Sequence, residues 1–309
     1  MNTDLRATLI FINWRTPDLT LAAVRSARER VAEAEGLQVI VVDNGSGDGS
    51  VDRLRRGLAE AEIVDLPENR GFAAAVNAGL QRARAPFSLI LNSDIEFDND
   101  AVAVLTEALE QDPKAALACP KLLRPDGTIQ AAAVPEPRLF WELTNRSLAR
   151  RTIRLHESRP TPVASVVGPC MAVHMERLQH VGGLDERFFF FFEETDWCRR
   201  MRQAGFRLLY VPQARVVHLQ GESANRRPIR ARVQFYQSRY KYFRKHGGPV
   251  AVGVLYAGLM LRLTVSVLSQ ALLSVLTCGR RRHRDKCVVY AVLWYWHVLG
   301  CRPRWGFEN

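Results

Sequence analysis

Short apolar runs alternate with helix-forming stretches over the first ~120 residues of the chain. The apolar runs cover 7–13, 37–43, 62–66 and 87–91, and stretches with helical periodicity cover 18–30, 72–84 and 100–111. Strands that alternate with helices through short connections form a mainly parallel sheet with flanking helices. We therefore predict an α/β fold for this part of the chain.

Polar side chains follow each predicted strand. In open α/β sheets, ligands bind at the carboxyl ends of the strands, so these side chains are candidates for a binding site. They are Asn13 after the first strand, Asp43 and Asn44 after the second, Arg70, Gly71 and Asn77 after the third, and Asn92, Ser93 and Asp94 after the fourth.

Two of these positions have alternative interpretations. Asp43 can bind a nucleobase or a ribose hydroxyl, or it can form only an Asx turn. Arg70 and the helix that starts beside it can face a phosphate, or they can form only a helix cap. The glycines that follow Asp43 lie after the second strand and lack the GxGxxG spacing, which argues against a dinucleotide site.

Asp94 and His218 are candidate metal ligands. A carboxylate at a strand end can bind Mg²⁺ or Mn²⁺, which complete their coordination with substrate phosphates. The alternative for Asp94 is a turn or a helix cap, and we expect Glu96 on the same strand face as Asp94. His218 follows a short apolar run, and it is a metal ligand, a donor to phosphate or a structural residue.

Five phenylalanines at 188–192 lead directly into Glu193, Glu194 and Asp196. Carboxylates beside apolar surface are costly to desolvate, and burial raises their pKa towards that of a general base. The alternative is that the acids only stabilise the positive end of a helix dipole. The phenylalanines themselves are expected to form core and pocket wall.

Composition limits the partners and the compartment. The 309 residues are 47% hydrophobic with a formal charge of +11, which predicts one large or two modest domains and anionic partners. No basic-aromatic pattern indicates nucleic acid. Six scattered cysteines without a CxxC pair predict reduced, buried thiols rather than zinc. The N-terminal apolar stretch is too short for a signal segment, so we expect no export.

Two segments depart from the strand–helix alternation. Residues 134–163 carry several prolines and arginines, and we expect an irregular crossover that could act as a lid. Residues 250–278 carry Arg262 as their single charge, a basic cluster covers 280–284, and 287–301 is apolar again. This tail predicts an in-plane or hairpin anchor on an anionic membrane, with packing on the first domain or a homodimer interface as alternatives.

The ordered motifs resemble those of family 2 glycosyltransferases, most closely the rhamnosyltransferase-like subgroup. They span about residues 7–246 and read IFINWRTP, VIVVDNGSGDGS, LPENRGFAAAVNAGL, LILNSD, GPCMAVHMERLQHVGGLDERFFFFFEETDWCRR and VVHLQGES. The resemblance implies a GT-A fold over residues 1–247, an NDP-sugar donor and a divalent cation, Mg²⁺ or Mn²⁺. Residues 248–309 would form a C-terminal helical apolar tail.

By motif position, the resemblance assigns roles to single residues. Asp43 would hold the nucleoside, Asp94 and His218 the metal, and Glu194 would be the catalytic base with Asp196 as its rival. The sugar and acceptor pocket would include Gly168, Pro169, Cys170 and Glu193. The donor site would include Asn13, Asn44, Arg70, Gly71, Asn77, Asn92 and Ser93.

Two departures from the family pattern affect these roles. Asn-Ser-Asp replaces Asp-x-Asp at the fourth strand, which leaves one carboxylate for the metal, and the base is Glu rather than Asp. We expect an inverting transfer, with dTDP-rhamnose as the candidate donor and a glycan or lipid-linked acceptor in cell-envelope polysaccharide synthesis. The expected location is the cytoplasmic face of the inner membrane. The alternatives are a non-catalytic sugar-nucleotide-binding or scaffold module and a nucleotide-dependent oxidoreductase.

Overall fold

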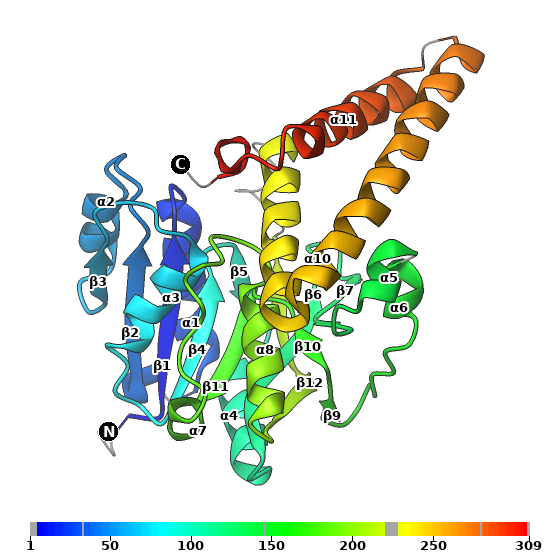
Figure 1. The fold of residues 1–309 in the computed structure, drawn as a ribbon. Helices are drawn as coiled ribbons and strands as arrows, with labels where there is room; N and C mark the ends of the chain where they lie inside the picture. The colour runs from blue at the N-terminus through cyan, green and yellow to red at the C-terminus, as the bar shows by residue number, and fades with distance from the viewer. Residues whose placement is uncertain (1–4, 33, 145, 220–227, 279, 308–309) are drawn as a thin grey trace. The chain divides into compact units, whose positions relative to one another are not determined.

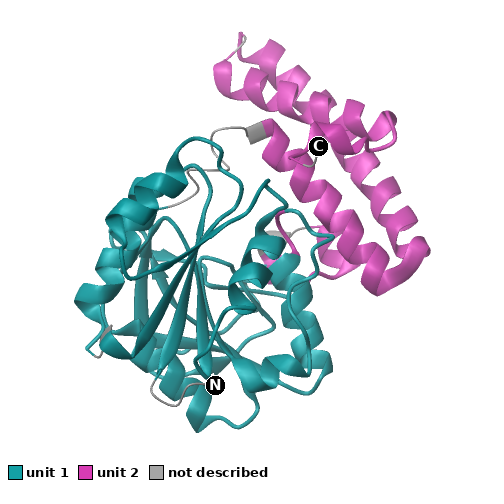
Figure 2. Cartoon of the chain, turned by 90° about the vertical axis from the view of Figure 1, so that its left-hand side faces the viewer, with its two compact units in different colours: residues 1–136, 150–189, 193–223 teal, residues 137–149, 190–192, 224–309 magenta. Residues whose placement is uncertain are grey.

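The structure, a computed structural model, describes residues 5–32, 34–144, 146–219, 228–278 and 280–307. The end of the last motif, residues 220–223, lies outside the described residues. The chain divides into two compact units (Figure 2). The sheet unit comprises Met1–Glu136, Arg150–Phe189 and Glu193–Ser223, and the helical unit comprises Pro137–Ala149, Phe190–Phe192 and Ala224–Asn309.

The sheet unit is built on a mixed ten-stranded sheet with the order β3-β2-β1-β4-β11-β6-β12-β5 (Figure 1). β1, β2, β3, β4, β6 and β12 all run in one direction, while β11 and β5 run in the other. The strand bounds are β1 Ala7–Asn13, β2 Leu37–Asp43, β3 Glu62–Asp65, β4 Phe87–Asn92, β5 Ile95–Phe97, β6 Ala115–Leu123, β7 Ile129–Gln130, β9 Thr161–Pro162, β11 Cys170–His174 and β12 Arg207–His218. The predicted α/β class with a mainly parallel sheet is confirmed.

Helices connect these strands and pack against the sheet. α3 packs on β1 and β2, α4 packs on β6, β11 and β12, and α8 packs on β12. The sequence expectation for α3 ran to residue 84, but the helix ends at Leu80, and turns follow it. The bounds are α1 Pro17–Arg30, α2 Ser50–Gly57, α3 Phe72–Leu80, α4 Ala101–Gln111, α7 Met175–Gln179 and α8 Glu193–Gln203.

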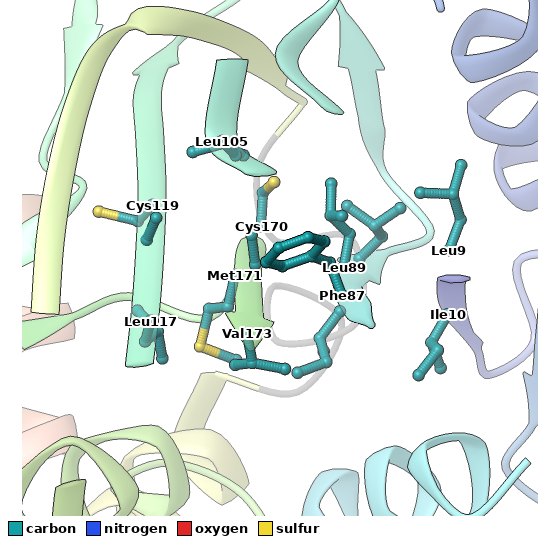
Figure 3. Close-up of a cluster of buried hydrophobic side chains, with 14 of the residues drawn as sticks. Leu9, Ile10, Phe87, Leu89, Leu105, Leu117, Cys119, Cys170, Met171 and Val173 are labelled. Carbon is teal, nitrogen blue, oxygen red and sulfur yellow. The ribbon is translucent and has the colours of Figure 1, made fainter. Parts of the chain in front are cut away.

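The core of the sheet unit forms because the central strands are buried on both faces. All seven residues of β1 and five of the six in β4 are buried. Figure 3 shows side chains of β1, β4, β6, β11 and α4 meeting in this core. Continuous apolar strands require cover on both faces, which explains why the valine-rich and isoleucine-rich runs identified the central strands.

β5 corrects one expectation about the fourth strand. Asp94 lies in the turn after β4, and Glu96 lies in β5, which pairs antiparallel with β12 at the far edge of the sheet. Asp94 is buried, whereas Glu96 is exposed. The two carboxylates therefore do not share a strand face, because the chain turns at Ser93 and Asp94 instead of continuing as one strand.

The segment 134–163 is less irregular than expected. It contains α5 Leu139–Leu143 and α6 Arg146–Arg150, and its ends contribute β9 and β8 Ala133–Val134, which pairs with β10 Ser165–Val166. Pro137–Ala149 belongs to the helical unit. Glu136, in the sheet unit, forms ion pairs with Arg199 at 3.1 Å and Arg202 at 3.0 Å on α8.

The helical unit is formed chiefly by α10 Pro228–Leu276 and α11 Arg281–Val298. Gly248 has a positive φ of 74° and interrupts α10 just before Pro249, so α10 consists of two helical arms, 228–247 and 249–276. The expected boundary between 247 and 248 lies at this kink, whereas the C-terminal segment of the helical unit comprises Ala224–Asn309. A buried ion pair between Glu142 and Arg239, 3.2 Å, joins α5 to the first arm.

One helix, Ile229–Leu276, is long and apolar enough by length and composition to cross a membrane. Within its most apolar window, 17% of the residues are buried. Arg262, the single charge in the apolar run, donates to the backbone oxygen of Glu142 at 3.2 Å. The helical character of the tail is therefore confirmed.

All six cysteines are free thiols, as the sequence predicted. Cys119, Cys170 and Cys198 are buried, but Cys278 is exposed, so the expectation that all are buried is wrong. Cys278 follows the end of α10, outside any packed core, which explains its exposure.

Close packing of α3 on the sheet gives a test of the fold. A Cβ at Gly79 would lie 2.3 Å from Ile10 Cγ2, so Gly79→Ala should destabilise the protein by roughly 1–3 kcal/mol through overpacking. A Cβ at Gly253 in α10 meets nothing within 4 Å, so Gly253→Ala should be neutral or stabilise by about 0.5–1 kcal/mol. Denaturant unfolding of both variants measures these changes, and an unchanged Gly79→Ala would contradict the helix–sheet packing.

Candidate functional site at the carboxyl edge of the sheet

The carboxyl ends of β1, β2 and β4 lie at one edge of the sheet, because the three strands are parallel neighbours. β11 is antiparallel to both β4 and β6, and β12 is parallel to β6. β12 therefore runs in the same direction as β4. The end of β12 therefore lies at the same edge. Asn13, Asp43, Asn92 and His218 each end one of these strands.

The loop after β2 is built around Asp43, whose side chain is fully buried. Asp43 Oδ2 accepts from Asn13 Nδ2 at 2.5 Å and from Ser46 Oγ at 2.7 Å, while Asp43 Oδ1 accepts from Ser46 N at 2.8 Å. Both carboxylate oxygens are thus engaged within the protein. The carboxylate accepts from a backbone N–H three residues on, so in this arrangement Asp43 shapes the loop, in line with the turn-forming alternative, rather than presenting its own oxygens at the surface.

Two loops meet at Gly45 and Asn44. Gly45 has a φ of 65°, and a Cβ there would lie 2.2 Å from the backbone carbon of Glu68. Asn44 Nδ2 donates to Asn69 Oδ1 and to the Gly71 oxygen, each at 3.1 Å. The loop after β2 therefore lies backbone to backbone against the loop after β3, which only glycine at 45 allows.

A third segment reaches the same edge at Gly71. Phe72 N donates to Phe189 O at 2.8 Å, and a Cβ at Gly71 would lie 2.4 Å from the same oxygen. The first N–H of α3 is therefore occupied by a protein carbonyl rather than left for a phosphate. This contact brings the segment before α8 beside the start of α3, although the two are more than a hundred residues apart in sequence.

The end of β4 is tied to two further elements. Asn92 N donates to Pro169 O at 3.0 Å, which places the Gly168–Pro169 turn beside the strand end. Ser93 Oγ accepts from Thr16 Oγ1 at 2.9 Å, at the start of α1. These bonds hold the two residues that directly precede Asp94.

Asp94 and His218 face each other at this edge. Asp94 Oδ1 lies 3.3 Å from His218 Nε2, and both side chains are more than nine-tenths buried. His218 Nδ1 lies 3.1 Å from the amide oxygen Oε1 of Gln130, on β7. An amide oxygen accepts, so a hydrogen on Nδ1 can be donated to Gln130, while Nε2 faces the carboxylate oxygen of Asp94.

With the ring hydrogen on Nδ1, the Nε2 lone pair and the carboxylate oxygen repel each other unless a positive charge lies with them. A proton on Nε2 or a divalent cation would relieve the repulsion, so the chemistry of the pair fits a metal ion. Among the described residues, no group of three or more His, Cys, Asp or Glu side chains could hold a metal. A two-residue site suits Mg²⁺ or Mn²⁺, which accept few protein ligands and retain water or phosphate oxygens.

The start of α8 lies at the same edge of the sheet. α8 leads through residues 204–206 into the first residue of β12, and it packs on β12 (Figure 1). Because β12 begins at the opposite edge, the eleven-residue helix, about 16 Å long, returns its first turn to the carboxyl edge. Phe191 and Phe192 directly before it have φ values of 67° and 70°, which bulky residues rarely adopt.

Glu193 and Glu194 in this first turn have unusual acidities. Burial raises the pKa of Glu194 from 4.5 to about 7, although backbone N–H groups lower it in part. Burial and the neighbouring Glu194 raise the pKa of Glu193 well above its usual value. Oε2 of each side chain is buried without a hydrogen-bond partner among the described residues. Glu194 can therefore take up and release a proton near neutral pH.

Asp196 has a different environment from Glu194. It is fully buried, and its Oδ2 accepts from Arg200 Nε at 2.8 Å. Arg200 also donates to the backbone oxygens of Val181 and Gly183. Asp196 therefore helps to hold the segment before the phenylalanine run, and this pairing favours Glu194 over Asp196 as the proton acceptor.

Arg70 and Asn77 converge on Glu186 instead of on open space. Arg70 NH2 lies 3.0 Å from Glu186 Oε2, and Asn77 Nδ2 lies 3.0 Å from Glu186 Oε1. Asn77 also exchanges two bonds with the backbone of Leu184. Both residues position the segment that leads to Phe189, a role that the sequence analysis did not assign.

Cys170 does not line a pocket. It starts β11, pairs with Leu91 and is 1% exposed, and its side chain lies in the apolar core (Figure 3). Burial raises its pKa to about 12, so the thiol stays protonated. Of its neighbours, Gly168 is half-buried and Pro169 is buried, and the Pro169 oxygen lies beside the end of β4.

Sequence reasoning missed Gln130 and Glu186. Gln130 lies on a two-residue strand without any motif, and nothing in the sequence indicates that β7 meets the end of β12. Glu186 lies in the quoted motif just before the phenylalanine run, so its acidic charge near that run was the available signal.

Comparison with known proteins identifies related sequences. The family model described as "Glycosyl transferase family 2" matches residues 9–181, more than half of the chain. The N-acetylglucosaminyl-diphospho-decaprenol L-rhamnosyltransferase of Mycobacterium tuberculosis is 28% identical over 251 residues, covering 74% of this chain and 80% of that protein. The O-antigen biosynthesis protein RfbC of Myxococcus xanthus is 28% identical over 280 residues, covering 87% of this chain and 20% of that protein.

Solved structures share the fold. The mannosyltransferase PcManGT from Pyrobaculum calidifontis, solved with GDP-Man and Mn²⁺, aligns with a TM-score of 0.57 at 18% identity, over 94% of this chain and 87% of that chain. GalNAc-T7, solved with UDP, GalNAc and Mn²⁺, aligns with a TM-score of 0.54 at 17% identity, over 71% of this chain and 44% of that chain. With the family match, these likenesses show that the chain belongs to glycosyltransferase family 2 and is a glycosyltransferase with the GT-A fold.

Proposed function

We propose that the chain transfers a sugar from a nucleoside diphosphate donor to an acceptor hydroxyl with inversion at the anomeric carbon. The convergence of Asp94, His218 and Glu194 at one edge of the sheet carries this proposal. Asp94 and His218 offer ligands to a cation, and Glu194 is a carboxylate able to accept a proton near neutral pH. One proton acceptor without a covalent nucleophile suffices for a direct displacement.

Asp94 and His218 would hold Mg²⁺ or Mn²⁺. A bound cation would supply charge neutralisation to the diphosphate leaving group. By accepting a hydrogen from Nδ1 of His218, the amide oxygen of Gln130 would leave Nε2 available for the cation. Arg70 is already paired with Glu186, so it contributes less positive charge at the diphosphate than the sequence suggested.

The donor would lie over the loops after β1, β2 and β4. Asn13 and Asp43 shape the loop that would contact the nucleoside, and Asn92 and Ser93 hold the strand end beside the metal ligands. We propose dTDP-rhamnose as the donor, supported by the similarity to a rhamnosyltransferase. The names of the relatives support a glycan or lipid-linked acceptor in cell-envelope polysaccharide synthesis. We also propose the cytoplasmic face of the inner membrane as the place of transfer.

Donor hydrolysis and transfer test this function. With Mn²⁺, the protein should release nucleoside diphosphate from dTDP-rhamnose, and NMR of a transferred product should show the inverted anomer. Glu194→Gln should lower kcat by about 10²–10⁴. Because Glu194 must be deprotonated, kcat/KM of the wild type should fall as the pH drops below about 7.

A nucleotide-binding measurement distinguishes a loss of catalysis from a loss of donor binding. Glu194→Gln should keep the thermal shift caused by dTDP with Mn²⁺, whereas Asp94→Asn should lose it. A protein that binds the nucleotide but never turns over any NDP-sugar would instead be a non-catalytic binding module.

The raised pKa of Glu194 predicts a pH-dependent stability. Between pH 4.5 and 7 the folded protein retains a proton that the unfolded chain releases, so stability falls as the pH rises through this window. Glu194→Gln should therefore gain almost no stability near pH 4.5 and on the order of 2 kcal/mol at pH 8. Urea unfolding at both pH values measures this difference.

The exposed Glu29 on α1 provides the matched control. Glu29→Gln should change stability little at either pH. An equal effect of Glu194→Gln at both pH values would rule out the proposed proton uptake at Glu194.

The contact between Gln130 and His218 predicts a positioning role. Gln130→Leu should weaken Mn²⁺ binding in the presence of dTDP by about 10- to 100-fold, measured by EPR titration of free Mn²⁺. Gln111→Leu, at the end of α4, removes an amide that contacts only the side chain of Glu107 among the bonds described, and it should leave binding unchanged. Unaltered Mn²⁺ affinity in Gln130→Leu would show that Gln130 does not orient His218.

A further inference from the structure

The second arm of α10, residues 249–276, exposes a continuous apolar stripe. Its members recur at spacings of three, four and seven residues, which places them on one face of a helix. Every member is at least 46% exposed, so the described chain does not cover this face. The apolar stripe consists of Val250, Val254, Leu261, Val265, Leu268, Leu272 and Val275.

The opposite face of the same arm is packed. Leu255, Leu259 and Leu263 are buried at four-residue spacing. A Cβ at Gly258 would lie 2.3 Å from Leu143 Cδ2, so α5 approaches this arm closely. The arm is therefore a fixed part of the helical unit with one face already occupied.

α10 and α11 form an antiparallel hairpin. Tyr256 OH donates to His297 O at 3.0 Å, Trp294 Nε1 donates to Thr264 Oγ1 at 3.0 Å, and His283 Nδ1 lies 3.0 Å from Gln270 Oε1. Residue numbers that rise on one helix fall on the other, as an antiparallel pair requires. α11 adds exposed side chains of its own, Val288, Trp294, Tyr295 and Val298.

The tip of the hairpin is strongly basic. Arg280, Arg281, Arg282, Arg284 and Lys286 are all exposed. Asp285 is the single acid among residues 280–286, and its carboxylate lies 3.6 Å from Arg281 Nε. The basic tip, residues 280–286, thus carries a net positive charge beside the apolar stripe.

We propose that this hairpin lies in the plane of an anionic lipid surface, with the apolar stripe in the acyl boundary and the basic tip on the headgroups. Apolar residues on one helical face with Lys and Arg beside them are the features of interfacial helices. Exposed Trp294 and Tyr295 suit the headgroup level. Anionic lipid complements the tip, whereas a second copy would bring the same positive charge.

A spanning orientation is opposed by the same tip. The basic tip connects the two helices, so a hairpin that crossed the bilayer would carry these cationic side chains through the hydrocarbon. Arg262 is bonded to the α5 backbone within the helical unit, which keeps this part of the arm against protein. An in-plane position leaves both features in place.

Vesicle flotation of the full chain tests this proposal. The wild type should float with vesicles that contain phosphatidylglycerol and not with phosphatidylcholine alone, and high salt should weaken the binding. Arg281→Gln, Arg282→Gln and Arg284→Gln together should weaken it about a hundredfold. The matched control is Arg25→Gln, Arg55→Gln and Arg56→Gln, which removes equal charge from exposed positions of α1 and α2 and should have a far smaller effect.

A second variant tests the apolar stripe. Leu268→Gln, Leu272→Gln and Val275→Gln should abolish flotation while the circular dichroism spectrum stays unchanged, because these side chains are 60% or more exposed. The proposal fails if the wild type does not bind anionic vesicles, or if the charge control loses as much affinity as the tip variant. It also fails if light scattering shows a lipid-independent dimer that the stripe variant dissociates, because a second copy would then cover the stripe.

Discussion

The facing pair of Asp94 and His218 joins the two halves of the sheet at the candidate site. Asp94 follows β4, near the middle of the sheet, and His218 ends β12, which pairs with β5 just beyond Asp94. A carboxylate oxygen and an imidazole nitrogen 3.3 Å apart require a positive charge beside them when the ring hydrogen is on Nδ1. The rest of the proposed chemistry depends on this positive charge, because a cation held by the pair would give the diphosphate of a donor a place to bind.

The start of α8 contains a second arrangement that is energetically costly. Two neighbouring carboxyl groups, each with an oxygen that lacks a partner, follow two phenylalanines in left-handed backbone conformations. Each feature raises the free energy of the folded state, and such features persist at functional sites because the surrounding structure holds them. Asp196, two residues after Glu194 in the same first turn, is paired with Arg200 and has a structural role.

The fold was predictable because its signals are local. β1 and β2 coincide with the expected strands, since a buried parallel strand must be apolar throughout. The loops after these strands were equally apparent, because polar residues directly follow apolar runs. Family 2 membership followed from six ordered motifs and is confirmed by the family match.

The individual roles at the site were less predictable, because they depend on contacts between distant segments. Cys170 lies in a motif but is buried in the core, since β11 is an internal strand whose first four residues are all buried. Asn77 and Arg70 lie in a motif but bind Glu186, more than a hundred residues away. Gln130 lies outside all of the motifs, and the pairing of β7 with β6 brings it to His218.

Anomalous diffraction from a crystal grown with Mn²⁺ and a nucleoside diphosphate tests the central claim most directly. The account predicts one manganese peak bound by Asp94 and His218 and by diphosphate oxygens, with the Glu194 carboxylate facing the diphosphate across space for one sugar. A manganese ion bound elsewhere, or a Glu194 side chain directed away from the diphosphate, would contradict it.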